Sequence, residues 1–105
     1  MKCMDDLYNQ LESLRSEGAA IIDVRTADEF AEAHIEGAIN LPHSEINQDS
    51  ATMLKEFSKI CVFCHMGGRA SVAEQILNSL GIQKVECINE DGMAAWIGKG
   101  YPVVP

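Results

Sequence analysis

Apolar residues in this chain follow two patterns, a helical spacing of three or four and short unbroken runs. Helical spacing over residues 4–16 and 70–80 predicts two amphipathic helices, each followed by a glycine. Three shorter helices are also predicted: one begins at the capping box of Thr26 and Glu29, one opens at Ser44 and is broken around NQDS, and one lies in DGMAAWIGKG. The remaining pattern consists of apolar runs typical of buried parallel strands, namely AAIIDV, GAINLP, KICVFC and KVECI.

The alternation of these strands and helices predicts an α/β fold. Right-handed crossovers would give a mainly parallel central sheet of four to five strands with helices on both faces, hence three layers. The 105 residues fit a single domain, 1–105, in which the N-terminal helical part, 1–18, is the least specific. Ligands of such sheets bind beyond the carboxyl ends of the strands, and Cys64, Asp23 and Arg25 follow or end strands at that edge.

The segment CHMGGR, between the third strand and the next helix, is the strongest candidate for chemistry. Gly67 and Gly68 allow backbone conformations with positive φ, in which successive N–H groups form an anion-binding nest. The following helix adds the positive end of its dipole, and Arg69 adds a permanent charge whose fork can pair with an oxyanion. These features stabilise a thiolate, so Cys64 is a candidate nucleophile. The alternative is that Cys64 is a buried strand-end residue and the glycines only make a tight connection.

Composition narrows the choice of partners and of compartment. The net charge is −8 and the eight Lys and Arg are scattered, which argues against binding to nucleic acid. No apolar run is long enough for a membrane span, and the start MKCMDDLYNQ has no apolar stretch of the kind that a signal peptide carries. The four cysteines are too few and too irregular for a disulfide scaffold. We therefore expect a cytoplasmic protein, or a periplasmic one if a signal peptide has been removed.

Three motifs in order resemble the single-domain rhodanese family. They are the block IIDVRTADEFAEAHIEGAINLP, the loop that begins at Cys64, and the ending INEDGMAAWIGKGYPV, which together span about residues 20–105. The matching positions are Asp23, Val24, Arg25, His34, Ile35, Gly37, Ala38, Asn40 and Pro42 in the first motif, Cys64, Gly67, Arg69 and Ser71 in the second, and Gly92, Trp96, Gly100, Pro102 and Val103 in the third.

The resemblance implies sulfur transfer through a persulfide on Cys64. The donor would be a small sulfur-containing anion such as thiosulfate, the acceptor would be cyanide, a thiol or a protein, and no metal or organic cofactor would be needed. The anion-binding loop would consist of His65, Met66, Gly67, Gly68 and Arg69. We expect a monomer. The resemblance also leaves room for a regulatory or persulfide-carrier module that acts on a protein partner.

Two residues at the end of the first strand are candidates for a supporting role. Asp23 can hold Arg69 or a loop N–H in place, or it can form a local ion pair with Arg25 that only fixes the fold.

Three competing interpretations concern the same cysteine. Tyrosine-phosphatase-like enzymes and arsenate reductases also use a Cys-to-Arg loop, but with five intervening residues, whereas four separate Cys64 from Arg69. A redox pair of Cys61 and Cys64 is disfavoured, because residues three apart in a strand point to opposite faces of the sheet. The same geometry disfavours a zinc site that combines these two residues with His65 and Cys87.

Overall fold

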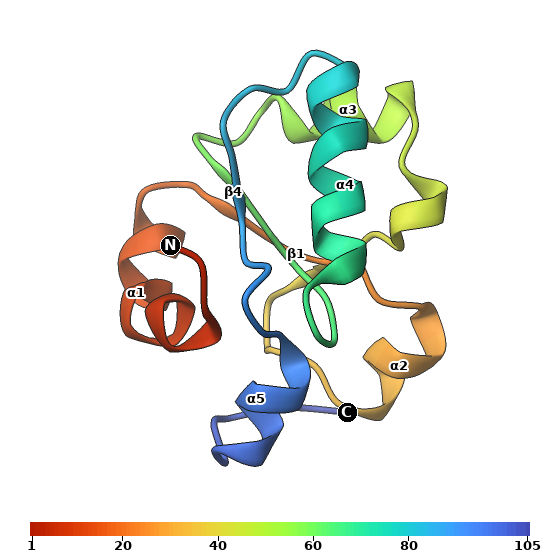
Figure 1. Cartoon of the computed structure of the whole chain (residues 1–105). Coiled ribbons are helices and arrows are strands. Elements are labelled where there is room, and N and C mark those ends of the chain that lie inside the picture. Colours follow the sequence, from red (N-terminus) through yellow and green to blue (C-terminus); the bar gives the residue numbers. More distant parts are fainter.

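The computed structural model describes residues 1–105 and contains one four-stranded sheet. The strand order is β2-β1-β3-β4 and all neighbours are parallel, which confirms the predicted α/β class (Figure 1). In register, Asp23 lies opposite Phe63, so the carboxyl ends of the two central strands meet at one edge. The strands are β1 (Ala20–Asp23), β2 (Ile39–Asn40), β3 (Ile60–Phe63) and β4 (Val85–Cys87).

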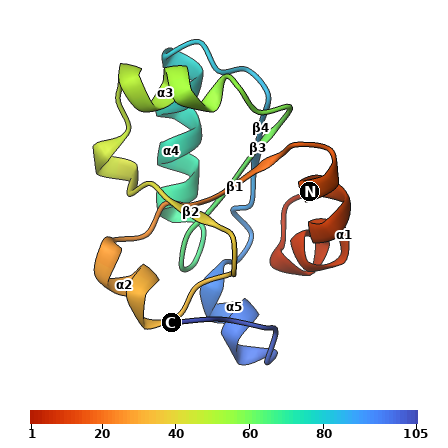
Figure 2. The same ribbon diagram turned by 180° about the vertical axis from the view of Figure 1, so that it is seen from behind.

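Helices cover both faces of the sheet, as predicted. Figures 1 and 2 show α3 and α4 on one face and α1 on the other, with α5 below it. Each face has its own core: Val62 and Leu77 belong to the α3/α4 side, whereas Leu7, Phe63 and Trp96 belong to the α1/α5 side. The helices are α1 (Met4–Ser16), α2 (Ala27–Glu32), α3 (Gln48–Leu54), α4 (Gly68–Ser79) and α5 (Met93–Gly98), with a 3-10 turn, η1 (His43–Glu45), before α3.

Side-chain caps set where two of the short helices begin. The predicted capping box is present at α2, where the N–H of Glu29 donates to the Thr26 hydroxyl. The helix predicted from Ser44 is split into η1 and α3, because Asn47 adopts an extended conformation and caps a new helix through its own capping box with Ser50. The break therefore lies between Glu45 and Gln48, at the start of the NQDS segment.

The second strand differs from the prediction. GAINLP was expected to be a buried strand, but β2 has only two residues and both are half-buried. The physical reason is its place at the sheet edge, where β1 is its single neighbour. Its side chains still serve the sheet, because the Asn40 amide donates to the carbonyl oxygens of Asp23 and Arg25 at 3.1 and 3.0 Å and so fixes the end of β1.

None of the five α-helices has the length and apolarity needed to traverse a bilayer.

Candidate functional site

Cys64 lies directly after β3, at the carboxyl edge of one of the two central strands. Its side chain is buried, with 1% exposure, among residues of the α3/α4 face. The sulfur atom accepts hydrogen bonds from two main-chain N–H groups, those of Gly67 at 3.0 Å and Ala70 at 3.3 Å. Main-chain donors arranged in this way stabilise negative charge on sulfur, because they are already aligned before the charge forms.

Gly67 makes this arrangement possible. Its φ of +119° lies in the left-handed region, and it forms the N-cap of α4. A Cβ atom at Gly67 would lie 2.2 Å from the carbonyl oxygen of Asn89, so the loop passes directly against the segment after β4. Gly68 differs from the prediction: its φ is not positive and a Cβ there would meet nothing within 4 Å. Only one of the two glycines is therefore required by the backbone.

Other N–H groups of the same turn have no partner within the protein. Those of His65, Met66, Gly68 and Arg69 donate no hydrogen bond, and the last two belong to the first turn of α4, where the helix dipole is positive. The side chains of His65 and Met66 are exposed, the latter by 70%. The turn thus offers free donors beside a sulfur atom that is itself hydrogen-bonded.

The N-terminus of α5 holds the loop through the carbonyl oxygens of Cys64 and His65. The N–H of Met93 donates to the carbonyl oxygen of Cys64 at 2.8 Å, and that of Ala94 donates to the carbonyl oxygen of His65 at 3.1 Å. Gly92 permits this contact, since a Cβ there would lie 2.2 Å from the Cys64 oxygen. The sequence analysis missed this role of Gly92, although a glycine just before a predicted helix is a signal of close backbone approach.

Arg69 does not present a free guanidinium to the turn. It makes two hydrogen bonds to the Glu29 carboxylate on α2, Nη1 to Oε1 at 2.6 Å and Nη2 to Oε2 at 2.9 Å. This bond from Arg69, with smaller contributions from Thr26, lowers the pKa of Glu29 to about 2. The sequence predicted Glu29 only as a capping residue. Its contact with Arg69 makes it a residue of the candidate site that the sequence analysis missed.

Asp23 and Arg25 form a buried ion pair with each other. The Arg25 side chain donates from Nη2 to Oδ2 at 2.8 Å and from Nε to both carboxylate oxygens, and its main-chain N–H donates to Oδ1. Arg25 also donates to the carbonyl oxygen of Ala33 at 2.7 Å, which ties the end of α2 to β1. Of the two alternatives for Asp23, the structure shows the local ion pair: its partner is Arg25, and no hydrogen bond joins it to Arg69 or to an N–H of the Cys64 loop.

The remaining strand cysteines are separate from the candidate nucleophile. Cys61 lies in the core of the α1/α5 face and Cys64 in that of the opposite face, which confirms that the CVFC pair points to two sides. Burial raises the pKa of Cys61 to about 11 and that of Cys87 to about 11. Both are neutral thiols at physiological pH and behave as small apolar residues.

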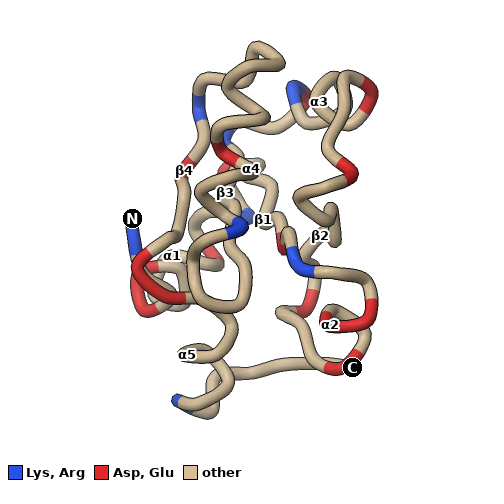
Figure 3. Tube along the Cα trace, turned by 45° about the vertical axis from the view of Figure 1, so that its right-hand side comes forward, with Lys and Arg blue, Asp and Glu red and all other residues tan.

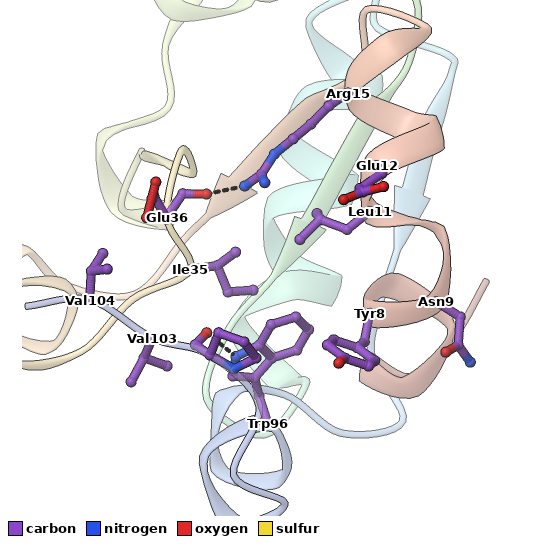
Figure 4. Close-up of a pocket in the computed structure, with 11 residues that line it drawn as sticks. Tyr8, Asn9, Leu11, Glu12, Arg15, Ile35, Glu36, Trp96, Val103 and Val104 are labelled. Carbon is purple, nitrogen blue, oxygen red and sulfur yellow. Dashed lines mark hydrogen bonds between the residues drawn. The ribbon is translucent and has the colours of Figure 1, made fainter.

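A cavity of about 580 Å³ lies away from this loop, between α1 and the C-terminal segment. Figure 4 shows Tyr8, Leu11, Ile35 and Trp96 among its walls, with Arg15 hydrogen-bonded to a main-chain carbonyl across it. No residue of the Cys64 loop lines this cavity, so it is not part of the candidate site.

The geometry of the loop agrees with the comparison to protein families. The sequence model of the rhodanese-like domain family matches residues 4–99 of this chain. The chain belongs to the rhodanese-like domain family. Among solved structures, this rhodanese-like chain is similar to a rhodanese-related protein from Thermoplasma volcanium, with 30% identity, a TM-score of 0.78 and coverage of 99% of this chain and 98% of the other. It is also similar to an E. coli structure described as rhodanese with anions, with 30% identity, a TM-score of 0.65 and coverage of 82% and 96%.

Two curated relatives carry names that refer to sulfur. The rhodanese-like chain is 37% identical over 84 residues to a putative sulfur carrier protein, YrkF of Bacillus subtilis. This match covers 79% of this chain and 44% of the relative. It is 33% identical over 66 residues to the thiosulfate sulfurtransferase PspE of E. coli, which covers 62% of this chain and 64% of the relative. The chain therefore spans less than two thirds of the length of either relative.

Proposed function

We propose that this rhodanese-like protein is a sulfurtransferase in which Cys64 carries the transferred sulfur as a persulfide. The observation that carries the proposal is the position of the Cys64 sulfur. This atom accepts main-chain hydrogen bonds from Gly67 and Ala70, inside a turn that has further free N–H groups. A donor such as thiosulfate fits a turn whose donors are aimed at a small anion.

The transfer takes place in two balanced steps. In the first, the Cys64 thiolate attacks the outer sulfur of thiosulfate, the sulfur–sulfur bond of the donor breaks, and sulfite leaves with the electron pair. In the second, a nucleophile such as cyanide or a thiolate attacks the terminal sulfur of the persulfide, and the Cys64 thiolate leaves. A covalent intermediate thus divides one transfer into two easier ones. The persulfide remains anionic between the steps, and the free N–H groups of His65, Met66 and Gly68 are the donors available to it.

Intact mass measurement after incubation with thiosulfate tests this proposal. We expect a gain of one sulfur atom, removed by cyanide with release of thiocyanate. Cys64→Ser should gain none, whereas Cys61→Ser should load like the wild type, because Cys61 lies on the other face of the sheet. A wild type that gains no sulfur from thiosulfate or from any persulfide donor would overturn the proposal. Turnover of an aryl phosphate without any sulfur loading would favour the phosphatase alternative.

A second candidate function is that of a persulfide carrier for a protein acceptor. Two observations favour it: Met66, two residues after the buried Cys64, is 70% exposed, and one relative is named as a putative sulfur carrier. Transfer from the loaded protein to a protein thiol that is much faster than transfer to cyanide would support this candidate. The reverse order of rates would support an enzyme that serves small acceptors.

A further inference from the structure

We propose that Glu29 sets the charge preference of the sulfur-transfer site, by neutralising Arg69 and thereby disfavouring dianionic sulfur donors relative to donors of lower charge. This inference rests on the proposed function. It ranks the donors of that function: thiosulfate remains a donor, and the site favours monoanionic and neutral sulfane sulfur compounds over it.

The carboxylate of Glu29 is held in place from two directions. Arg69 donates to both of its oxygens, at 2.6 and 2.9 Å, which is the paired geometry in which a guanidinium binds a carboxylate most firmly. On its own helix, the main-chain N–H and the hydroxyl of Thr26 both donate to Oε1 at 3.1 Å. Four hydrogen bonds therefore fix the carboxylate before any substrate arrives. An incoming anion must compete with this preorganised partner to reach the Arg69 fork.

The pair lies beside the loop that holds the nucleophile. Arg69 directly precedes Ala70, whose N–H bonds the sulfur of Cys64 at 3.3 Å. The hydrogen bond to Glu29 raises the pKa of Arg69, and the charges of Cys64 and Asp23 add to the effect. The pKa of Glu29 is lowered to about 2, so the carboxylate stays ionised at any pH at which the thiolate reacts.

The surroundings supply little positive charge in place of Arg69. Asp23 already neutralises Arg25 in the buried pair, and α2, which carries Glu29, is itself acidic (Figure 3). With Glu29 bound to Arg69, the side chains at the mouth contribute no net positive charge, and attraction of an anion depends on main-chain N–H groups. Main-chain N–H dipoles attract an anion over a shorter range than a full positive charge does, so they offset less of the repulsion that Glu29 exerts on the second negative charge of a dianionic donor.

Glu29→Gln is the variant that isolates the charge. Glutamine at this helix position can keep the capping box and can still accept a bond from Arg69, so α2 should remain folded. Glu32→Gln is the matched control, since Glu32 lies on the same helix, is exposed, and makes no hydrogen bond or ion pair. Both variants change the net charge by one, and only the first frees Arg69.

Two donors that differ in charge provide the readout. Thiosulfate is a dianion and methanethiosulfonate is a monoanion; each gives its sulfane sulfur to the Cys64 thiolate, with sulfite or methanesulfinate leaving. At low salt we expect Glu29→Gln to raise kcat/KM for thiosulfate on the order of fivefold, mainly through KM, and to raise it about twofold for methanethiosulfonate. The first gain is about the square of the second, because the interaction energy scales with the charge of the donor. Both gains should fade at 1 M salt, where the screening length is about 3 Å.

Arg69→Gln should give the opposite sign, because it leaves the Glu29 charge uncompensated beside the loop. Thiosulfate loading should then fall more than methanethiosulfonate loading. Equal effects on the two donors, effects that do not depend on salt, or a Glu29→Gln profile that matches Glu32→Gln would each overturn the inference. Sulfur loading with an unchanged donor preference would refute this inference alone, whereas absence of loading from every donor would refute the proposed function as well.

Discussion

The backbone at Gly67 yields the sharpest prediction of the structure, because the neighbouring Gly68 supplies its control. An alanine at 67 would place its Cβ 2.2 Å from the carbonyl oxygen of Asn89 and 2.8 Å from its carbonyl carbon. Real Cβ atoms stay at 3.0 Å or more from such atoms, so the loop and the segment after β4 must separate by about 0.8 Å. The φ of +119° adds strain that any side chain would feel.

Two costs combine in the Gly67→Ala variant. A residue with a side chain held in a sparsely populated backbone region costs about 1–3 kcal/mol. Forced overpacking against a neighbouring segment costs about 1–3 kcal/mol more. We therefore expect the free energy of unfolding to fall by about 2–6 kcal/mol, a large part of the roughly 5–15 kcal/mol that stabilises a domain. The shift also removes or weakens the 3.0 Å bond from the Gly67 N–H to Cys64, which should slow persulfide formation about tenfold or more, since bonds to charged groups contribute about 1.5–3 kcal/mol.

Urea unfolding of the wild type, Gly67→Ala and Gly68→Ala provides the measurement. Gly68→Ala should leave the free energy of unfolding unchanged or raise it by up to about 1 kcal/mol, because Gly68 lies in the first turn of α4 and its added Cβ meets nothing within 4 Å. Equal stability of the two variants would refute the reasoning, since both make the same chemical change and differ only in φ and in the approach of Asn89.

Three further outcomes follow from the contacts of the site. Gly92→Ala should push the start of α5 away from the loop and lower the rate of sulfur loading, as followed by intact mass, because its Cβ would lie 2.2 Å from a carbonyl oxygen of the loop; a rate equal to that of the wild type would contradict this. Asp23→Asn should reduce the free energy of unfolding by about 3–5 kcal/mol in a urea titration, because it leaves the buried Arg25 without a counter-charge; a loss below about 1 kcal/mol would show that the pair does not stabilise the fold. Iodoacetamide at pH 7.5 should leave Cys61 and Cys87 unlabelled in the native protein, because burial raises the pKa of each to about 11; peptide mapping that finds either residue labelled as fast as Cys64 would contradict their assignment to the core.

Features that repeat along the chain were predictable from the sequence. The period of the apolar residues gave the helices and strands, and the alternation of the two gave a parallel sheet with Cys64 at its carboxyl edge. The step of three between Cys61 and Cys64 was enough to place them on opposite faces, since side-chain direction in a strand depends only on sequence separation. The weakest element was β2, because an edge strand of two residues has too few positions to show a pattern.

Contacts between distant segments were not predictable in the same way. The pairing of Arg69 with Glu29 joins residues 40 positions apart, and the charge pattern of α2 equally suits a solvent-exposed helix. The contrast between Gly67 and Gly68 likewise arises from Asn89, which reaches the loop only after β4 has paired with β3. Such contacts depend on the relative placement of completed elements, which local pattern does not encode.

The site is built mainly from main-chain groups, and this has a consequence for how it can vary. The sulfur of Cys64 is bound by N–H groups of Gly67 and Ala70, and the loop is held from behind by N–H groups of α5. None of these bonds uses the side chain of His65 or Met66, both of which are exposed at the surface of the loop. If the proposed sulfur transfer takes place here, we expect substitutions at these two positions to alter which acceptor docks without disturbing the donors to the sulfur. Exposed side chains would then select the partner, and main-chain groups would serve the transfer step.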